Sequence, residues 1–152
     1  MTTVASDSVH GQALALAGGR NVYRERPVNL RIKARISIEQ VLFFDPEVIV
    51  VQEASFFNDI YRDGRWSGIR AVRNKRVFLE PDTPFNWMDR PPSFLRLLGA
   101  KWLAGILYPG RSSEKLMDQT AEFFKLFLGK TLENQEIRIL INRDRYPSDQ
   151  GL

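Results

Sequence analysis

The chain has 152 residues, of which 43% are hydrophobic and 26% are charged, a composition typical of one globular domain and not of a disordered segment. No apolar run reaches the roughly 18 residues of a membrane span, and the first residues lack the basic and apolar parts of an export signal. We therefore expect a soluble chain that carries no export signal. The absence of cysteine excludes disulfides, thiolate metal sites and a cysteine nucleophile within these residues.

The net charge is +4, but the 22 basic residues are spread along the chain among 18 acidic ones. A nucleic-acid-binding protein usually concentrates its basic residues on one face, together with aromatic stacking platforms. The densest basic stretch, Arg20 to Arg35, fits a solvated surface segment better than such a face. We expect no nucleic-acid partner.

The first part of the chain predicts little regular structure. Thr2 to Ser8 is small and polar, and reads as a loop that follows an absent strand. A short helix is predicted from His10 to Ala17, ended by Gly18 and Gly19. Val22 to Arg35 has no steady periodicity and contains a proline, which indicates an extended connection.

A helix and a strand follow with clearer signals. Ser37 is placed to cap a helix over Ile38 to Phe44, which Asp45 and Pro46 end. Val48 to Val51 is the clearest strand in the chain. Its continuous β-branched residues indicate burial on both faces, which favours a parallel sheet in an α/β fold.

The middle of the chain predicts a helix over Phe56 to Tyr61, a turn at Arg62 to Gly68, and a second strand over Arg76 to Glu80. Pro81 and Pro84 prevent that strand from continuing. After the polar and aromatic loop that follows, Pro91 and Pro92 are expected in the first turn of a strongly apolar helix that ends before Pro109.

The last part predicts two more helices. Glu114 to Leu128 begins after a serine cap and ends at Gly129, and Glu133 to Ile141 forms a short final helix. The apolar side chains of the first of these are expected to pack inward; they are Leu116, Met117, Phe123, Phe124, Leu126, Phe127 and Leu128. Residues 141–152 are expected to form a loose tail.

Enzymatic motifs are absent from the sequence. His10 is the one histidine, and there is no nucleophile elbow, phosphate-binding glycine loop, zinc-protease motif or dinucleotide fingerprint. Nothing in the spacing of the carboxylates singles out a catalytic pair. We predict that the protein is not an enzyme and needs no cofactor.

The loop from Phe85 to Arg90 is the best candidate for binding a ligand, because rigid elements hold both of its ends. Trp87 offers a flat ring, Arg90 a forked cation, and Asn86 both a donor and an acceptor. Together they would suit a bulky ligand with polar edges. The alternative is structural: Trp87 packs under the following helix, and Arg90 pairs with Asp89 or with a helix end.

Four segments resemble, in the same order, conserved blocks of the class III periplasmic substrate-binding proteins of ABC importers, which serve ferric siderophores, haem and cobalamin. The segments read LALAGGRNV, SIEQVLFFDPEVIVV, GRWSGIRAVRNKRVFLEP and KWLAGILYP, and the resemblance runs roughly from Thr3 to Phe127.

Members of that family have two α/β lobes joined by a long helix, with the ligand held between them. All four blocks resemble the C-terminal lobe, so the resemblance implies that residues 1–152 form such a lobe. The expected fold is a small, mainly parallel sheet flanked by helices in three Rossmann-like layers. The N-terminal lobe, the linking helix and the first strand of this lobe would be missing.

The resemblance also implies the function. A full-length protein of this family would capture a metal chelate (siderophore, haem or corrinoid) or a metal ion, in the periplasm or at the cell surface. It would deliver that solute to a membrane permease without chemistry. The alternative is a non-catalytic interaction module that binds no ligand alone and dimerises through an exposed lobe face or an open sheet edge.

Site residues follow from the resemblance position by position. Glu39 matches the glutamate that contacts basic residues of the permease, although a carboxylate in a first helical turn also has a simple dipole role. Asn86, Trp87 and Arg90 align with the cleft-lining acid, tryptophan and arginine of cobalamin-binding members, with the acid here replaced by an amide.

Further cleft residues are expected at two other loops. Ser6 and Asp7 would lie in the first cleft loop, and Ser55 and Phe56 follow the strand ending at Val51, at its carboxyl end. His10 is a candidate metal ligand that would need partners from the absent lobe. Its alternative role is that of a surface or capping group.

Overall fold

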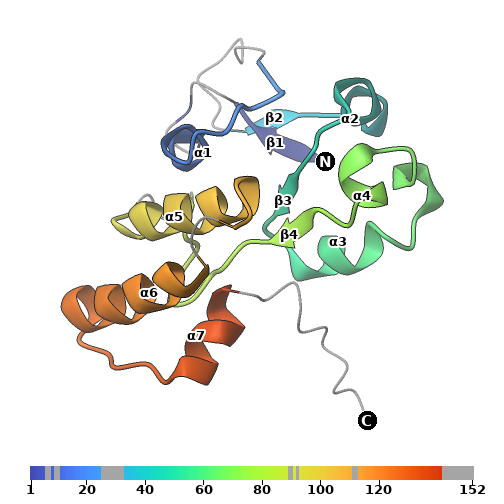
Figure 1. Ribbon diagram of the computed structural model, residues 1–152. Helices are drawn as coiled ribbons and strands as arrows, with labels where there is room; N and C mark the ends of the chain where they lie inside the picture. The colour runs from blue at the N-terminus through green and yellow to red at the C-terminus, as the bar shows by residue number, and fades with distance from the viewer. Residues whose placement is uncertain are drawn as a thin grey trace.

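The structure is a computed structural model that describes residues 1–5, 8, 11–24, 33–88, 91, 93–110 and 113–141 (Figure 1). Predicted site residues Ser6, Asp7, His10 and Arg90 fall outside this part of the chain, as does the tail from residue 142. In chain order the elements are β1 (Thr2–Val4), α1 (Gln12–Leu16), β2 (Lys33–Arg35), α2 (Ile38–Phe44), β3 (Ile49–Val51), α3 (Ala54–Asp59), the 3-10 helix η2 (Gly64–Trp66), α4 (Arg70–Arg73), β4 (Val77–Leu79), α5 (Leu95–Leu107), α6 (Ser113–Leu128) and α7 (Asn134–Ile141).

The described residues form a mixed α/β domain with two separate two-stranded sheets. β3 and β4 pair in parallel, with Val51 opposite Leu79, as the apolar run over Val48 to Val51 predicts. β1 and β2 pair antiparallel, with Thr2 opposite Arg35. Two predictions are corrected here: the sheet is not a single, mainly parallel one, and Thr2–Val4, predicted as part of a loop, form a strand.

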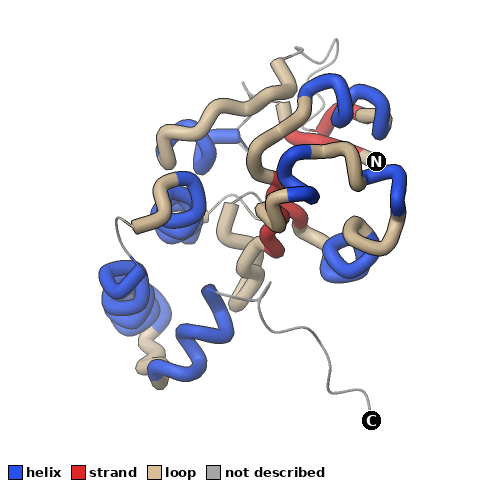
Figure 2. Tube along the Cα trace, turned by 45° about the vertical axis from the view of Figure 1, so that its right-hand side comes forward, coloured by secondary structure: helices blue, strands red, loops and turns tan. Residues whose placement is uncertain are grey.

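The parallel pair is covered on both faces. Val50 and Phe78 face a cluster built on α5, α6 and α7, whereas Val51 and Leu79 belong to a second cluster with Ile60, Trp66 and Ile69. Alternate residues of a strand point to opposite faces, so a sheet between two clusters needs apolar residues throughout. Figures 1 and 2 both show α5 and α6 on one side of β3 and β4, with α3 and α4 on the other.

The helix α5 lies against α1 and α6, and its side chains form the centre of the larger cluster. Leu95, Leu98, Trp102 and Leu103 are buried there. The indole Nε1 of Trp102 donates to the Ile141 carbonyl oxygen at 2.9 Å, which ties the end of α7 to the middle of α5. Among the described residues, no helix is both long and apolar enough to cross a membrane.

Helix ends follow the sequence signals closely. Ser37 and Gln40 form a reciprocal capping box at the start of α2, and Asp45 ends that helix in the left-handed conformation. Gly18 ends α1 with φ of +76°. The main displacement is in α5, which begins at Leu95 and not at the two prolines.

Two inward predictions for α6 are wrong. Leu116 and Phe124 are buried, but Leu126 and Phe127 are 69% and 58% exposed. A helix presents only a stripe to its neighbours, and the three consecutive apolar residues Leu126 to Leu128 cannot all lie within that stripe.

Candidate functional site

The carboxyl ends of β3 and β4 meet at one edge of the domain, because the two strands are parallel and in register. The first residue after each strand is polar: Gln52 follows Val51, and Glu80 follows Leu79. The Nε2 atom of Gln52 donates to Oε2 of Glu80 at 3.3 Å. In open α/β sheets, ligands bind outside this edge, so this is where a site is expected.

Glu80 is 2% exposed and organises the loop that follows it. Its Oε1 accepts a hydrogen bond from the Met88 backbone N–H at 2.6 Å, and the Trp87 N–H donates to the Pro81 carbonyl at 3.1 Å. The loop is therefore folded back onto the strand end. The carboxyl oxygens of this buried side chain accept from both the loop backbone and Gln52, so Glu80 holds the loop in place.

Asn86 is half-buried in this loop, and its Oδ1 also accepts from the Met88 N–H, at 3.1 Å. The amide is thus oriented by the backbone two residues ahead. Of the predicted cleft loop, Asn86 is the residue that the structure places beside the strand-end pair of Gln52 and Glu80.

Trp87 occupies the core, as the structural alternative expected. It is 0% exposed, its Nε1 donates to the Thr83 carbonyl at 2.9 Å, and its ring lies 6.4 Å from that of Phe124. Stacking on a ligand requires an accessible ring face. The predicted stacking role does not fit this placement, because packing against α5 and α6 takes up the whole side chain.

Gly99 of α5 explains how the loop lies so close to the helix. A Cβ at this position would overlap the Trp87 carbonyl oxygen and lie 2.9 Å from its carbonyl carbon. Only glycine leaves room for the loop backbone here.

Ser55 and Phe56 lie in the first turn of α3, directly after the carboxyl end of β3. Ser55 is exposed, whereas Phe56 is half-buried and packs edge-on against Trp66 at 5.2 Å. Phe56 therefore contributes to the smaller cluster, and Ser55 is the one of the two with its side chain in solvent.

Glu39 is exposed in the first turn of α2. A hydrogen bond from Ser37, the backbone of the helix start and the nearby Arg65 lower the pKa of its carboxyl group below the ordinary range. The carboxylate therefore stays charged at neutral pH. In Figure 1, α2 lies at the upper right, while the chain after β4 runs away from it toward α5 and α6.

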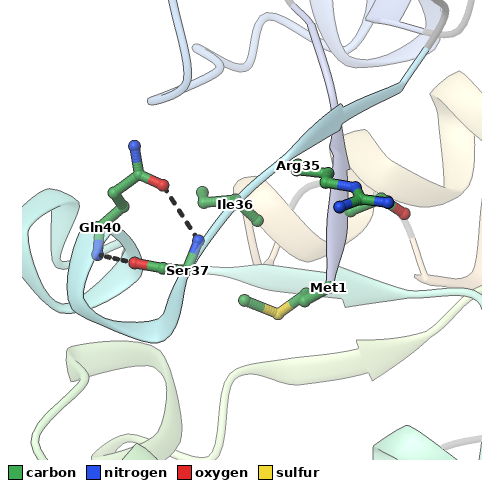
Figure 3. Close-up of a pocket in the computed structure, with 6 residues that line it drawn as sticks. Met1, Arg35, Ile36, Ser37 and Gln40 are labelled. Atoms are coloured by element: carbon green, nitrogen blue, oxygen red, sulfur yellow. Dashed lines mark hydrogen bonds between the residues drawn. The ribbon is translucent and has the colours of Figure 1, made fainter.

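An open hollow lies beside the start of α2, lined by Met1, Thr2, Arg35, Ile36, Ser37 and Gln40 (Figure 3). Ser37 and Gln40 already bond to each other's backbone N–H groups there, at 3.3 and 3.0 Å. The Oγ atom of Ser37 and the Oε1 atom of Gln40 are thus engaged in the helix cap. Within the described part of the chain, no three histidine, aspartate or glutamate side chains are grouped to hold a metal ion.

The sequence interpretation missed Gln52 and Glu80. Both were visible as the first polar residue after an apolar run, but their proximity depends on the strand register, which no local pattern reveals.

Comparison with known proteins supports the assignment of the fold. No family model matches the chain. The molybdate-binding protein MolA of Haemophilus influenzae is 33% identical over 119 residues, which cover 77% of this chain and 33% of MolA.

Solved structures support the same assignment of the fold. An ABC transporter solute-binding protein from Sulfurospirillum deleyianum is 41% identical, with a TM-score of 0.85 over 92% of this chain and 43% of that protein. MolA bound to molybdate matches with 30% identity and a TM-score of 0.69, over 87% and 40% of the respective chains. A periplasmic solute-binding protein from Veillonella parvula, 24% identical with a TM-score of 0.76 over 91% and 43%, shows the shared fold.

These relatives are named as binding proteins and not as enzymes, which agrees with the predicted class. The chain spans between a third and somewhat over two fifths of their lengths. Over that span, its sequence and fold are those of the periplasmic solute-binding proteins of ABC transporters, of the MolA-like class III type, and the chain belongs to that family.

Proposed function

We propose that this chain forms one lobe of the solute-binding component of an ABC importer, and that the solute contains a metal. The observation that carries the proposal is the 41% identity and TM-score of 0.85 to a solute-binding protein of an ABC transporter. The solute would be held between the strand-end edge of this lobe and a second lobe, in the periplasm, before delivery to the permease.

The described residues favour a compact solute over a flat macrocycle. The side chains of Gln52 and Asn86 at this edge are polar, whereas the one tryptophan of the loop is buried in the core. A metal oxyanion or a small chelate suits a polar edge better than a flat macrocycle does, because a macrocycle needs an aromatic or apolar platform. The likeness to MolA, a molybdate-binding protein, points in the same direction. Arg90, Ser6, Asp7 and Ser55 remain proposed contacts at this cleft, and His10 a proposed metal ligand.

Isothermal titration calorimetry of a protein spanning the full length of the relatives tests the proposal. The probes are molybdate, tungstate, a ferric siderophore, haem and cobalamin, with sulfate as the control anion. We expect saturable one-to-one binding to one of these classes, with a Kd of about 1 μM or tighter. If none of the probes binds saturably, the proposed solute class is refuted.

The contribution of the strand-end edge is tested separately. Asn86→Ala should weaken binding of the recognised solute by about tenfold, because a bound polar group loses its partner. Asn58→Ala, which removes an exposed amide from α3, is the matched control and should leave the Kd unchanged. Equal Kd values for the two variants would exclude Asn86 from the site.

A second candidate function is self-association without ligand binding. The observation in its favour is a group of partly exposed rings at the start of α5 and on α6. The ring centroid of Phe94, directly before α5, lies 5.7 Å from that of Phe123 and 5.6 Å from that of Phe127, and Phe127 is 58% exposed. Exposed apolar patches commonly mark interfaces. Sedimentation equilibrium decides: a tight dimer that binds no probe supports this candidate, and a monomer excludes it.

A further inference from the structure

The carboxyl group of Glu80 connects segments of the strand-end edge that are far apart in the chain. Its Oε2 accepts from Nε2 of Gln52, at the end of β3, and its Oε1 accepts from the Met88 backbone N–H. The same N–H also donates to Oδ1 of Asn86. One buried side chain thus joins Gln52 to the loop that carries Asn86.

This use of a buried polar side chain differs from that of Thr120, which is also fully buried. The Thr120 hydroxyl donates to the Leu116 carbonyl at 2.7 Å, one turn back in its own helix. Glu80 instead accepts from groups 28 residues before it and 8 residues after it. The bonds of Glu80 therefore fix the relative positions of separate segments, whereas the bond of Thr120 stays within one helix.

A carboxyl group suits this position because both of its oxygens accept hydrogen bonds. A glutamine in place of Glu80 would have one oxygen and one NH2 group. If its oxygen kept the bond to the Met88 N–H, its NH2 group would face the NH2 group of Gln52, and Gln52 would have to turn its amide by 180° to bond again. Glu80 therefore determines which end of the Gln52 amide faces it.

The exposed fractions of the side chains assign different roles to Glu80 and Gln52. Glu80 is 2% exposed, which leaves almost no surface for a solute, whereas Gln52 is half-buried at the carboxyl end of its strand. Ligands of open α/β sheets bind outside this edge. A side chain that is oriented before the solute arrives also loses less entropy on binding.

We infer that Gln52 contacts the solute, and that Glu80 is a positioning residue that orients the Gln52 amide and holds the Asn86 loop beside it. The inference rests on the proposed function and adds two residues to its site. It requires a solute that presents a hydrogen-bonding group to the amide, as metal oxyanions and small chelates do.

The experiment uses a protein that spans the full length of the relatives. Calorimetry with molybdate, tungstate, a ferric siderophore, haem and cobalamin gives the Kd of the probe that the wild type binds. The variants are Glu80→Gln, Gln52→Ala and the double substitution. Glu122→Gln, at an exposed position of α6, and Ile137→Val, which shortens a buried side chain of α7, are the controls.

We expect Gln52→Ala and Glu80→Gln each to weaken binding by about tenfold, because each removes or misorients a hydrogen-bonding group. The double variant should weaken binding by much less than the product of the two effects, since Glu80 acts through Gln52. Ile137→Val should lower the Tm and keep the wild-type Kd, which separates a loss of stability from a loss of orientation. Glu122→Gln should change neither quantity.

NMR of protein with 15N in the glutamine side chains gives a readout that a loss of stability alone does not change. The Gln52 NH2 signals are assigned by their absence from the Gln52→Ala spectrum. Without solute they should shift in Glu80→Gln but not in Ile137→Val, because only the first substitution changes the partner of this NH2 group. In the wild type they should also shift when the bound probe is added.

Several outcomes would overturn the inference. If Gln52→Ala keeps the wild-type Kd, Gln52 is not a contact, and this test applies even if Glu80→Gln does not fold. If Glu80→Gln folds and keeps the wild-type Kd, or if the effects of the two substitutions multiply, Glu80 does not act through Gln52. Gln52 signals that stay unchanged in Glu80→Gln would show that the carboxyl group does not orient the amide.

Failure of the proposed function would look different. The wild type would then bind none of the probes, and the assigned role of Gln52 would fall with the function. Binding by the wild type together with any of the outcomes above would overturn the inference alone.

Discussion

Gly99 offers a sharp test of how the loop of the candidate site is held. In Gly99→Ala the new Cβ would overlap the Trp87 carbonyl oxygen and come within 2.9 Å of its carbon. These are backbone atoms, which cannot rotate away as the end of a flexible side chain can. Either the loop or α5 must shift, and overpacking of this kind costs about 1–3 kcal/mol.

A second glycine of the same helix, Gly105, serves as the control that separates the overpacking cost from the gain in helix propensity. A Cβ at Gly105 would meet nothing within 4 Å. Gly105→Ala should therefore stabilise the protein by about 0.5–1 kcal/mol through helix propensity alone. Because both substitutions gain the same propensity, their difference in unfolding free energy should equal the overpacking term, about 1–3 kcal/mol.

Thermal and urea unfolding of the two variants measure this difference. For a chain of this size, each kcal/mol corresponds to a Tm change of about 2–4 °C, so Gly99→Ala should melt about 2–12 °C below Gly105→Ala. Hydrogen exchange adds a local readout: the Met88 N–H, bonded to Glu80, should exchange faster only in Gly99→Ala. Equal melting temperatures would refute the close approach of loop and helix.

Three further predictions concern single side chains. Trp87→Ala should destabilise the protein by about 3–5 kcal/mol in urea unfolding, as expected for a buried aromatic residue, whereas Asn86→Ala should change stability little. If the two variants lost similar unfolding free energies, the placement of Trp87 in the core would be contradicted. Glu80→Gln should cost about 1–3 kcal/mol, because it replaces a buried acceptor of two hydrogen bonds, with Glu122→Gln at an exposed position of α6 as the control. The Glu39 carboxyl should titrate below its ordinary range in an NMR pH series, so it should remain charged as the pH falls through that range. Ser37→Ala should raise the titration midpoint of Glu39, because it removes the hydrogen bond that lowers the pKa most. A midpoint that does not move would exclude Ser37 as the main cause.

The burial of Trp87 changes how the cleft loop is understood. Tryptophan, arginine and asparagine in one loop suggested a ligand-binding set, and the sequence left open whether the tryptophan served ligand or core. The answer came from Gly99 and Phe124, which lie 12 and 37 residues further along the chain. Contacts at such separations leave no local pattern.

Local signals were sufficient for most of the secondary structure. The capping box at Ser37 and Gln40, the left-handed Gly18, and the apolar run that becomes β3 all act through nearest neighbours in the chain. The antiparallel pair of β1 and β2 was missed, because each strand has only three residues and neither alternates clearly.

The sequence by itself determined the longer helices, the parallel strand pair and, through four short motifs, the family. These depend on capping, periodicity and residue type, which are properties of short stretches of chain. Only the tertiary structure decided that Gln52 and Glu80 meet at one edge, that Trp87 belongs to the core, and that Leu126 and Phe127 are exposed. The physical reason is that strand register and packing join residues distant in sequence, and a side chain's role depends on what covers it.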